Sequence, residues 1–374
     1  MSEFLIYEKN VQGPATHALV IGVGHYPHLG GGGGRKSPYS DGMIQLTSPP
    51  ISALAFANWL IGTYNNPAAQ LATVALLATQ PVPPAPFPNA RIPSLQNVIL
   101  AAEEWWQRGR TSEEDVLIFY FSGHGVSEGL AMSLLLSDFG QSDAAPYSRA
   151  IDFNKFCLGM ARAKARRQLF FVDACRSSSD TFAGSGGAYG NPLIEPNADE
   201  YSAKEAPVFF STLAGDSSYG RTHKTTVFTE ALLEGLNGGG GSDQDGPWEI
   251  WTSRLNDSLR FTMEQQPGDR RQVPNMGNGA SFAFHRLPGP PKVPTIIGCS
   301  PDMAADHATL AYKSDDTGEA DERAPPHANA WKENLTAGIY DFYAAFPGNQ
   351  YRNALKRNKS VVPPYQRIRI EVVP

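Results

Sequence analysis

The chain has 374 residues, of which 41% are hydrophobic, and a formal net charge of −6. This charge gives no reason to expect a nucleic acid or an anionic membrane as a partner, and no apolar run approaches the length that spans a bilayer. Three cysteines are too few for a disulfide framework, and the first residues lack the pattern of a signal peptide, so we expect a cytoplasmic protein with free thiols.

Short apolar runs alternate with helical patterns along most of the chain. The runs that predict strands are 17–24, 72–79, 115–123, 168–174 and 206–214. They are apolar almost throughout, as is typical of a parallel sheet that is covered on both faces. The segments that predict helices are 48–64, 94–109, 152–166, 226–236 and 250–264. This order predicts an α/β fold, a three-layer α/β/α sandwich with a mostly parallel central sheet.

Local signals place the ends of the first three helices. Ser48 is the expected N-cap of the first helix, with Pro49 in its first turn. The second helix begins at Ser94 and stops at Gly109, a C-cap residue type. Asp152 begins the third helix, whose basic tail suits the helix dipole.

The connections divide the chain. Residues 176–206 form a long Ser/Gly/Asn/Pro stretch, and segments of this length without strand or helix signals are more often functional or disordered than structural. We expect one domain over 1–287 and a Pro-rich linker over 288–298. Alternating runs at 308–315, 338–346 and 366–373 then predict a small β-rich domain over 299–374.

The five glycines at 30–34 resemble a phosphate-binding loop only superficially. Arg35 separates the last glycine from Lys36, so the Gly-Lys-Ser/Thr register fails. We expect a flexible surface loop here, and a nucleotide-binding domain is the weakest of the functional alternatives.

Two predicted strands end in reactive side chains. One run ends in "SGHG" with His124, and another ends in "DAC" with Cys175, 51 residues later. Because ligands of parallel sheets bind beyond the carboxyl ends of the strands, these residues share one edge if the strands are neighbours. A thiol next to an imidazole is a nucleophile and general base pair. The backbone N–H groups of Gly125 and Cys175 are candidates for an oxyanion hole.

The motifs "SGHG" and "DACR" resemble those of the caspase-like cysteine peptidases, which include caspases, metacaspases and bacterial relatives. Segments "HALVIGVGHY", "TVFTEALLEGL" and "RRQVPNMGNGASFAF" resemble further parts of that family, so the resemblance covers about residues 15–286. It implies a cysteine endopeptidase with a protein substrate and a Cys–His dyad, in which 176–206 links the large and small subunit regions.

The resemblance also implies a substrate preference. Asp173 and Ser122 match the metacaspase residues that line the pocket for the Arg or Lys before the scissile bond. A competing interpretation is that Asp173 caps the backbone that follows it. Ser52 stands where metacaspases carry a further acidic residue, which weakens a strict basic preference. Asp216 is a second candidate acid for this pocket, and a plain turn residue is an equal alternative.

The sequence leaves more than one mode of activation possible. By resemblance, cleavage after Arg176 or Lys204 would process a zymogen, and an activating protease or a regulator that docks on the C-terminal domain is a further expected partner. We expect no cofactor and no metal, since the acidic stretch 314–322 forms no clear calcium ligand cluster. A role in bacterial defence or regulated cell death rests on family analogy alone. The alternative function is an inactive caspase-like scaffold that binds partners.

Overall fold

The computed structural model describes residues 2–79, 90–128, 131–175, 190–200, 202–212, 222–244, 246–265, 273–277, 279–325 and 331–374. Its α-helices are α1 (Ser48–Gly62), α2 (Leu95–Arg108), α3 (Phe153–Met160), α5 (Val227–Glu234) and α6 (Thr252–Glu264). The strands up to residue 286 are β1 (Leu5–Glu8), β2 (Ala15–Gly22), β3 (Gln70–Ala78), β4 (Val116–Gly123), β5 (Gly125–Glu128), β6 (Ala131–Leu135), β7 (Ala150–Asp152), β8 (Arg167–Ala174), β9 (Val208–Phe210), β10 (Gly241–Ser242), β11 (Glu249–Trp251), β12 (Asn275–Gly277) and β13 (Ala283–Arg286).

The chain forms two compact units. One consists of Met1–Leu233 and Thr262–Ser281, and the other of Glu234–Phe261 and Phe282–Pro374. The predicted domain limit at 287 stays a prediction.

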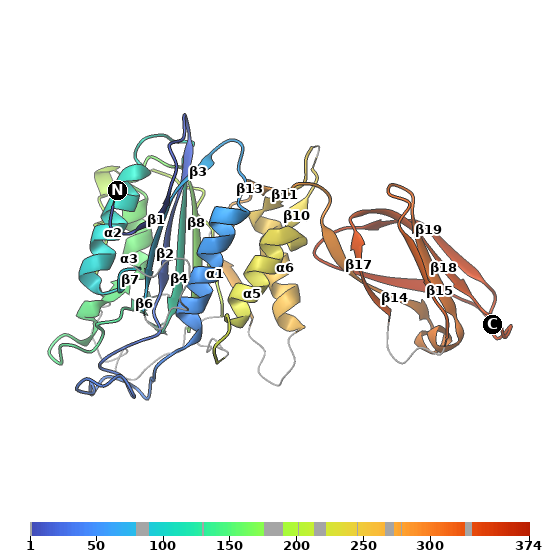
Figure 1. Ribbon diagram of the computed structural model, residues 1–374, viewed down its shortest axis with the longest axis horizontal. Coiled ribbons are helices and arrows are strands. Elements are labelled where there is room, and N and C mark those ends of the chain that lie inside the picture. The colour runs from blue at the N-terminus through green and yellow to red at the C-terminus, as the bar shows by residue number, and fades with distance from the viewer. Residues whose placement is uncertain are drawn as a thin grey trace. The chain divides into compact units, whose positions relative to one another are not determined.

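The first unit is built on a seven-stranded sheet of order β1-β3-β2-β4-β8-β9-β12 (Figure 1). The neighbours from β3 to β9 are parallel, and both edge strands, β1 and β12, are antiparallel. The sheet is therefore mostly parallel, as the non-alternating apolar runs predict, and the three-layer α/β sandwich is confirmed. The order makes β4 and β8 direct neighbours.

Helices cover both faces of this sheet, with α2 and α3 on one side and α1 and α5 on the other (Figure 1). Successive strand residues point to opposite faces. Accordingly Phe119 of β4 contacts Phe156 of α3, with ring centroids 5.1 Å apart, whereas the next residue, Tyr120, stacks on Phe56 of α1 at 4.7 Å. Residues 120, 122, 171 and 173 therefore face the α1 side.

The helix signals are largely confirmed. Ser94 caps α2 by accepting a hydrogen bond from the Asn97 N–H, and Asp152 caps α3 by accepting one from Lys155. The expected Ser48 cap is wrong, because Ser48 is the first helical residue and Thr47 holds the N-cap position. Helix α3 ends at Met160, so the predicted basic tail lies in the turns beyond it.

Part of the predicted loop 176–206 is packed against the domain. Ile194 is buried, and its carbonyl lies so close to Gly159 of α3 that a Cβ on that glycine would be 1.9 Å away. Gly190 adopts a φ of +124°, which favours glycine. Residues 190–200 thus have a fixed path, whereas residues 176–189 lie outside the described residues.

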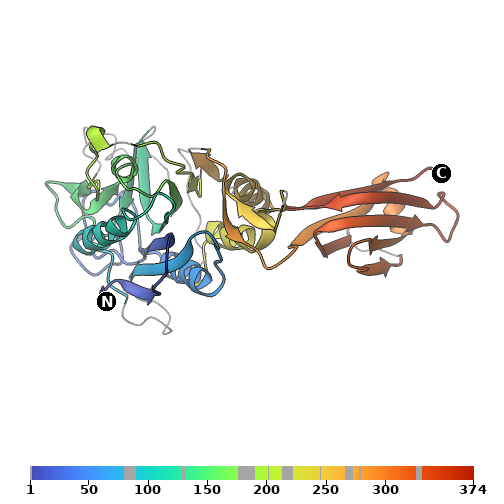
Figure 2. The same cartoon turned by 90° about the horizontal axis from the view of Figure 1, so that it is seen from above.

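The last part of the chain consists of strands and one 3-10 turn, Asp302–His307, among its described residues (Figure 2). The strands are β14 (Lys292–Ser300), β15 (Thr309–Ser314), β16 (Ala320–Arg323), β17 (Trp331–Thr336), β18 (Gly338–Ala345), β19 (Ala354–Val361) and β20 (Gln366–Glu371). They form two sheets, β17-β14-β20 and β16-β15-β18-β19. A C-terminal β-rich part is confirmed.

The predicted linker 288–298 is wrong over most of its length, because Lys292–Ser300 is the central strand of a sheet. Proline lacks the N–H that a central strand needs, which is why the sequence favoured a linker. Pro294 pairs only with Asn334 of β17, since the pairing with β20 begins at Thr295. The proline therefore sits where β14 has one neighbour.

Candidate functional site

A cavity of about 390 Å³ lies at the carboxyl ends of β4 and β8. The register pairs Ser122 with Asp173 and Gly123 with Ala174, so His124 and Cys175 each follow the end of their strand directly. The described lining consists of Ile44, Gln45, Leu46, Thr47, Ser48, Pro49, Ser122, Gly123, His124, Asp173, Cys175, Thr222 and Thr226. The imidazole and the thiol thus line one cavity, as the strand order predicts, and their chemical roles stay predictions.

The ring of His124 is oriented by a backbone carbonyl. Its Nε2 lies 2.8 Å from the carbonyl oxygen of Ile44. A carbonyl only accepts, so Nε2 carries the proton and Nδ1 of the neutral ring is left as the basic nitrogen. Burial lowers the pKa of His124, and the Ile44 carbonyl partly opposes this. The imidazole is therefore neutral, and able to accept a proton, at neutral pH.

Tyr26 fixes the backbone of His124. Its Oη accepts a hydrogen bond from the His124 N–H at 2.8 Å, and its O–H donates to the Leu135 carbonyl at 3.4 Å. The rings of Tyr26 and His124 also contact, with centroids 5.0 Å apart. Burial raises the pKa of Tyr26 far above its ordinary value, so the phenol stays protonated.

The glycine-rich loop between β2 and α1 carries Ile44 to this position. The Gln45 side chain accepts a hydrogen bond from the Tyr26 N–H at 2.8 Å and donates to the carbonyls of Tyr26 and Gly30, both at 3.0 Å. Gly30 also forms a β-bridge with Ile44. The glycines do lie in a surface loop, as expected, but the loop is tightly folded: a Cβ on Gly32 would lie 2.1 Å from the Tyr26 carbonyl oxygen, an approach that glycine permits.

Asp173 lines the cavity with only 2% of its surface exposed. Its Oδ2 accepts hydrogen bonds from the hydroxyls of Ser122 at 3.2 Å, Thr229 at 3.1 Å and Thr226. Three donated hydroxyls stabilise the charged form of a buried carboxylate. These donors favour a carboxylate in the cavity wall over the protonated acid.

Further polar groups behind the cavity orient the hydroxyls that donate to Asp173. Thr226 is the N-cap of α5, because its Oγ1 accepts the Thr229 N–H at 3.1 Å. Its own N–H donates to Ser52 Oγ at 3.0 Å. The Tyr120 hydroxyl lies 2.6 Å from Thr229 Oγ1, and burial together with the charge of Asp173 raises the pKa of Tyr120. Tyr120 therefore stays protonated and donates, so that Thr229 donates onward to Asp173.

Gly125 lies against the backbone of the second strand end. A Cβ at this position would be 2.7 Å from the Cys175 carbonyl oxygen and 2.9 Å from the Ala174 Cβ. Only glycine permits this approach, which brings the two backbone segments named for the oxyanion hole together. The use of their N–H groups stays a prediction.

The remaining predicted residues are placed differently. Ser52 does not line the cavity and contacts Thr226 behind it. Asp216 and Arg176 lie outside the described residues, as does the backbone beyond Cys175 that Asp173 would cap. Lys204 lies on the other face of the sheet, and the N–H of Glu205, which follows its peptide bond, donates to the Arg166 carbonyl at 2.9 Å. Cleavage after Lys204 would require this contact to open.

Four contributors were not found in the sequence: Tyr26, the Ile44 carbonyl, Thr226 and Thr229. Thr226 had a signal, since a threonine before an apolar helical run is an N-cap residue type. The carbonyl of Ile44 had none, because a backbone group leaves no mark on residue identity.

In the part of the chain that is described, no group of three or more His, Cys, Asp or Glu side chains is arranged to hold a metal ion. Among the same residues no helix is long and apolar enough to cross a membrane.

Comparisons with known proteins give one family. The family model described as caspase domain matches residues 15–279. The uncharacterized protein y4kE of Sinorhizobium fredii is 24% identical over 194 residues, covering 48% of this chain and 54% of that protein. A probable protease of a Desulfuromonadales bacterium is 25% identical over 308 residues, covering 77% of this chain and 33% of that protein. The chain thus spans about half of the first relative's length and about a third of the second's.

Among solved structures, the crystal structure of caspase-1 from Spodoptera frugiperda is similar over 74% of this chain and 91% of that chain. The sequence identity is 14% and the TM-score is 0.40.

Proposed function

The chain belongs to the caspase domain family, and from this premise we propose that it is a cysteine endopeptidase with Cys175 as nucleophile and His124 as general base. The observation that carries the proposal is the shared cavity: the thiol, the imidazole and a buried carboxylate line the same 390 Å³ space at adjacent strand ends. The thiol of Cys175 or the imidazole of His124 alone would not indicate a peptidase.

The proposed reaction starts with the neutral imidazole. His124 Nδ1 takes the proton of the Cys175 thiol, and the thiolate attacks the carbonyl carbon of the scissile bond. The N–H groups of Gly125 and Cys175 stabilise the oxyanion. The imidazolium then gives its proton to the leaving amine, and water hydrolyses the thioester. The Ile44 carbonyl favours the tautomer that these reaction steps need, with the proton on Nε2 and Nδ1 free to accept one.

We further propose cleavage after Arg or Lys. The cavity wall presents Asp173, a carboxylate that accepts three hydroxyl hydrogen bonds from the protein. A cationic side chain that enters the cavity pairs with a charge that is already desolvated and oriented, which favours binding. Ser52 accepts a hydrogen bond from the N–H of Thr226, which in turn donates to Asp173. Ser52 thus acts on the carboxylate through Thr226 and is not itself a second acid of the pocket.

Fluorogenic peptides with Arg, Lys or Asp before the cleaved bond test this proposal. We expect turnover of the Arg and Lys peptides, at least a thousandfold loss in Cys175→Ala, and full activity in the control Cys299→Ala, whose thiol is buried in the C-terminal strands. Asp173→Ala should lower kcat/KM for Arg and Lys peptides about a hundredfold, by loss of a charged hydrogen bond. An unchanged residue preference in Asp173→Ala would contradict the specificity, and turnover that does not depend on Cys175 would contradict the nucleophile.

Activation by cleavage within 176–206, a zymogen state and a role in bacterial defence belong to the same proposal and rest on family analogy. Mass spectrometry of the purified protein before and after activity appears tests the first of them. We expect new termini after Arg176. Full activity of an uncut Arg176→Ala chain would rule out processing at this residue.

A further inference from the structure

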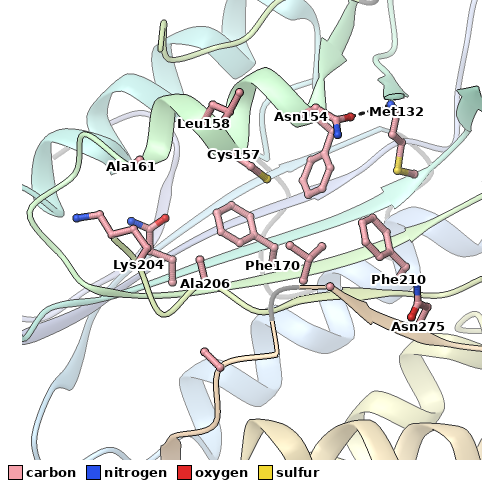
Figure 3. A pocket seen from close by; sticks show the side chains of 15 residues that line it. Met132, Asn154, Cys157, Leu158, Ala161, Phe170, Lys204, Ala206, Phe210 and Asn275 are labelled. Carbon is pink, nitrogen blue, oxygen red and sulfur yellow. Dashed lines mark hydrogen bonds between the residues drawn. The ribbon is translucent and has the colours of Figure 1, made fainter. Parts of the chain in front are cut away.

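A second and larger cavity, of about 750 Å³, lies on the other face of the sheet (Figure 3). One wall is α3, and the facing wall is formed by β8, β9 and β12. The apolar side chains of these walls are Phe153, Cys157, Leu158, Phe170, Val208 and Phe210. Phe170 points away from the side of the sheet that carries Asp173, since the two are three positions apart in a strand. This cavity is therefore separate from the candidate catalytic cavity.

The residues of each wall show the side-chain spacing of a helix on one side and of strands on the other. Residues 153, 157 and 158 lie on one face of α3. On the facing side of the sheet, every second residue of each strand segment points into the cavity: 168 and 170, then 206, 208 and 210, then 275 and 277. In Figure 3, Cys157 projects from α3 toward Phe170, and the Asn154 amide is directed toward Met132. Leu158 is 55% exposed and Phe210 is half-buried. The folded chain thus leaves apolar surface in contact with water, and covering it with an apolar ligand is favourable.

The polar side chains Asn154 and Gln168 in the walls already form hydrogen bonds within the protein. Asn154 Oδ1 accepts the Met132 N–H at 2.9 Å, and Gln168 Nε2 donates to the carbonyls of Met160 and Ala165 at 3.0 and 3.1 Å. A peptide in this space would bring N–H and C=O groups that need partners. A ligand whose buried part has no polar groups fits better.

Lys204 supplies the one positive charge of the described lining, which contains no Asp or Glu. It lies at one end of the cavity, opposite Met132 and Asn275 (Figure 3). Its ammonium donates to the Ala163 carbonyl and to Ser202 Oγ, both at 2.6 Å and both neutral. No carboxylate of the described chain forms an ion pair with it.

This ammonium is partly desolvated. Burial lowers the pKa of Lys204, and the positive charge of Arg166 adds to this effect while Glu113 opposes it. Because the hydrogen-bond partners of this ammonium are neutral, an anion at this end of the cavity would further stabilise the partly buried cation.

We propose that this cavity binds a long-chain monocarboxylate, such as a fatty acid, with its alkyl chain between α3 and the sheet and its carboxylate paired with Lys204. The volume lies within the range of small-molecule sites. The site uses no residue of the Cys175 cavity, so the proposal stands or falls independently of peptidase activity.

Titration of the full chain with cis-parinaric acid, whose fluorescence rises in apolar surroundings, tests the proposal. We expect saturable binding at one site, displacement by palmitate, and much weaker displacement by methyl palmitate, which has no charge. Lys204→Met keeps the apolar stem and should weaken acid binding about tenfold, as expected for loss of a charged hydrogen bond. Lys164→Met is the matched control, since its ammonium donates to the Thr111 carbonyl and lies outside the cavity lining.

Ala206→Trp, which fills the cavity, should abolish binding. Thermal unfolding of Ala206→Trp, compared with that of the wild type, shows whether this variant folds. If it does not fold, the test depends on the binding affinity of Lys204→Met. Equal affinity of Lys204→Met and wild type, equal displacement by the methyl ester, or the absence of saturable binding would each overturn the proposal.

Discussion

At the scale of single residues, the surroundings of Asp173 favour the carboxylate over the protonated acid. A carboxylate with 2% exposure would normally take up a proton, but three hydroxyl donors favour the ionised form. The donors have little freedom, because Thr226 is held by the N-terminus of α5 and Thr229 by Tyr120. Thr226 is therefore a positioning residue for the proposed substrate-binding carboxylate.

Replacing Thr226 tests this role. Thr226→Val keeps the shape but removes the donor to Asp173 and the cap of α5, so it should lower the free energy of unfolding by about 1–2 kcal/mol. Steady-state kinetics with an Arg peptide should show KM raised about tenfold with kcat nearly unchanged.

Thr226→Ser is the matched control, because it retains the hydroxyl and should restore KM. A purely structural role would instead leave KM at the wild-type value in the folded fraction of Thr226→Val.

What could be predicted at this scale depends on side-chain chemistry. His124 and Cys175 could be singled out because reactive side chains at the ends of apolar strands are unusual, whereas Asp173 and Ser122 were assigned to the pocket through the resemblance to metacaspases. The Ile44 carbonyl could not be found, since it reaches His124 across 80 residues of sequence and only the folded loop brings it there. Tyr26, next to that loop, was hidden for the same reason.

At the scale of elements, apolar runs and cap residues predicted the central strands and most helix starts. The errors lie where local rules compete with packing. The proline at 294 indicated a linker, although β14 pairs around it, and the glycines at 30–34 indicated flexibility, although they permit close backbone contacts. Glycine and proline mark special backbone positions, but the sequence does not say whether these are loose or tight.

Two glycines at the ends of helices should respond oppositely to alanine. Gly159→Ala places a Cβ 1.9 Å from the Ile194 carbonyl oxygen, so we expect α3 or residues 190–200 to shift and the free energy of unfolding to fall by roughly 2 kcal/mol or more. Gly62→Ala, at the end of α1, meets no atom within 4 Å and should be neutral or stabilising by up to about 1 kcal/mol. Urea unfolding measures both, and equal values would contradict the packing described for Ile194.

At the scale of the whole molecule, buried histidines make stability depend on pH. His17, 8% exposed with Nδ1 2.9 Å from Thr73 Oγ1, has its pKa lowered to about 4, mainly by burial and against the attraction of Asp115. Because the unfolded chain takes up this proton near pH 6.5, stability rises with pH between about 4 and 6.5 and is lost as pH falls through that window.

This residue should therefore remove up to about 3 kcal/mol of stability between pH 6.5 and pH 4. Chemical unfolding at a series of pH values should show a shallower dependence in His17→Asn, while His25→Asn, at an exposed position, keeps the wild-type slope. The same slope in His17→Asn and wild type would show that His17 is not buried in its neutral form.

The sequence also predicted the large-scale division into an α/β part and a C-terminal strand-rich part, because periodicity changes from continuous apolar runs to alternation. It could not show how the chain divides into the two compact units. Residues 234–261 join the second unit although they precede the strand-rich part by dozens of residues.

We propose Cys175 as the nucleophile of a site that accepts a basic side chain. The most direct measurement is labelling of the folded protein with an Arg-containing peptidyl acyloxymethyl ketone, followed by mass spectrometry of the modified peptide. We expect one adduct, on Cys175, formed far more slowly in His124→Ala and Asp173→Asn. An adduct on Cys157 or Cys299, or labelling that continues at the same rate in those variants, would contradict the proposal.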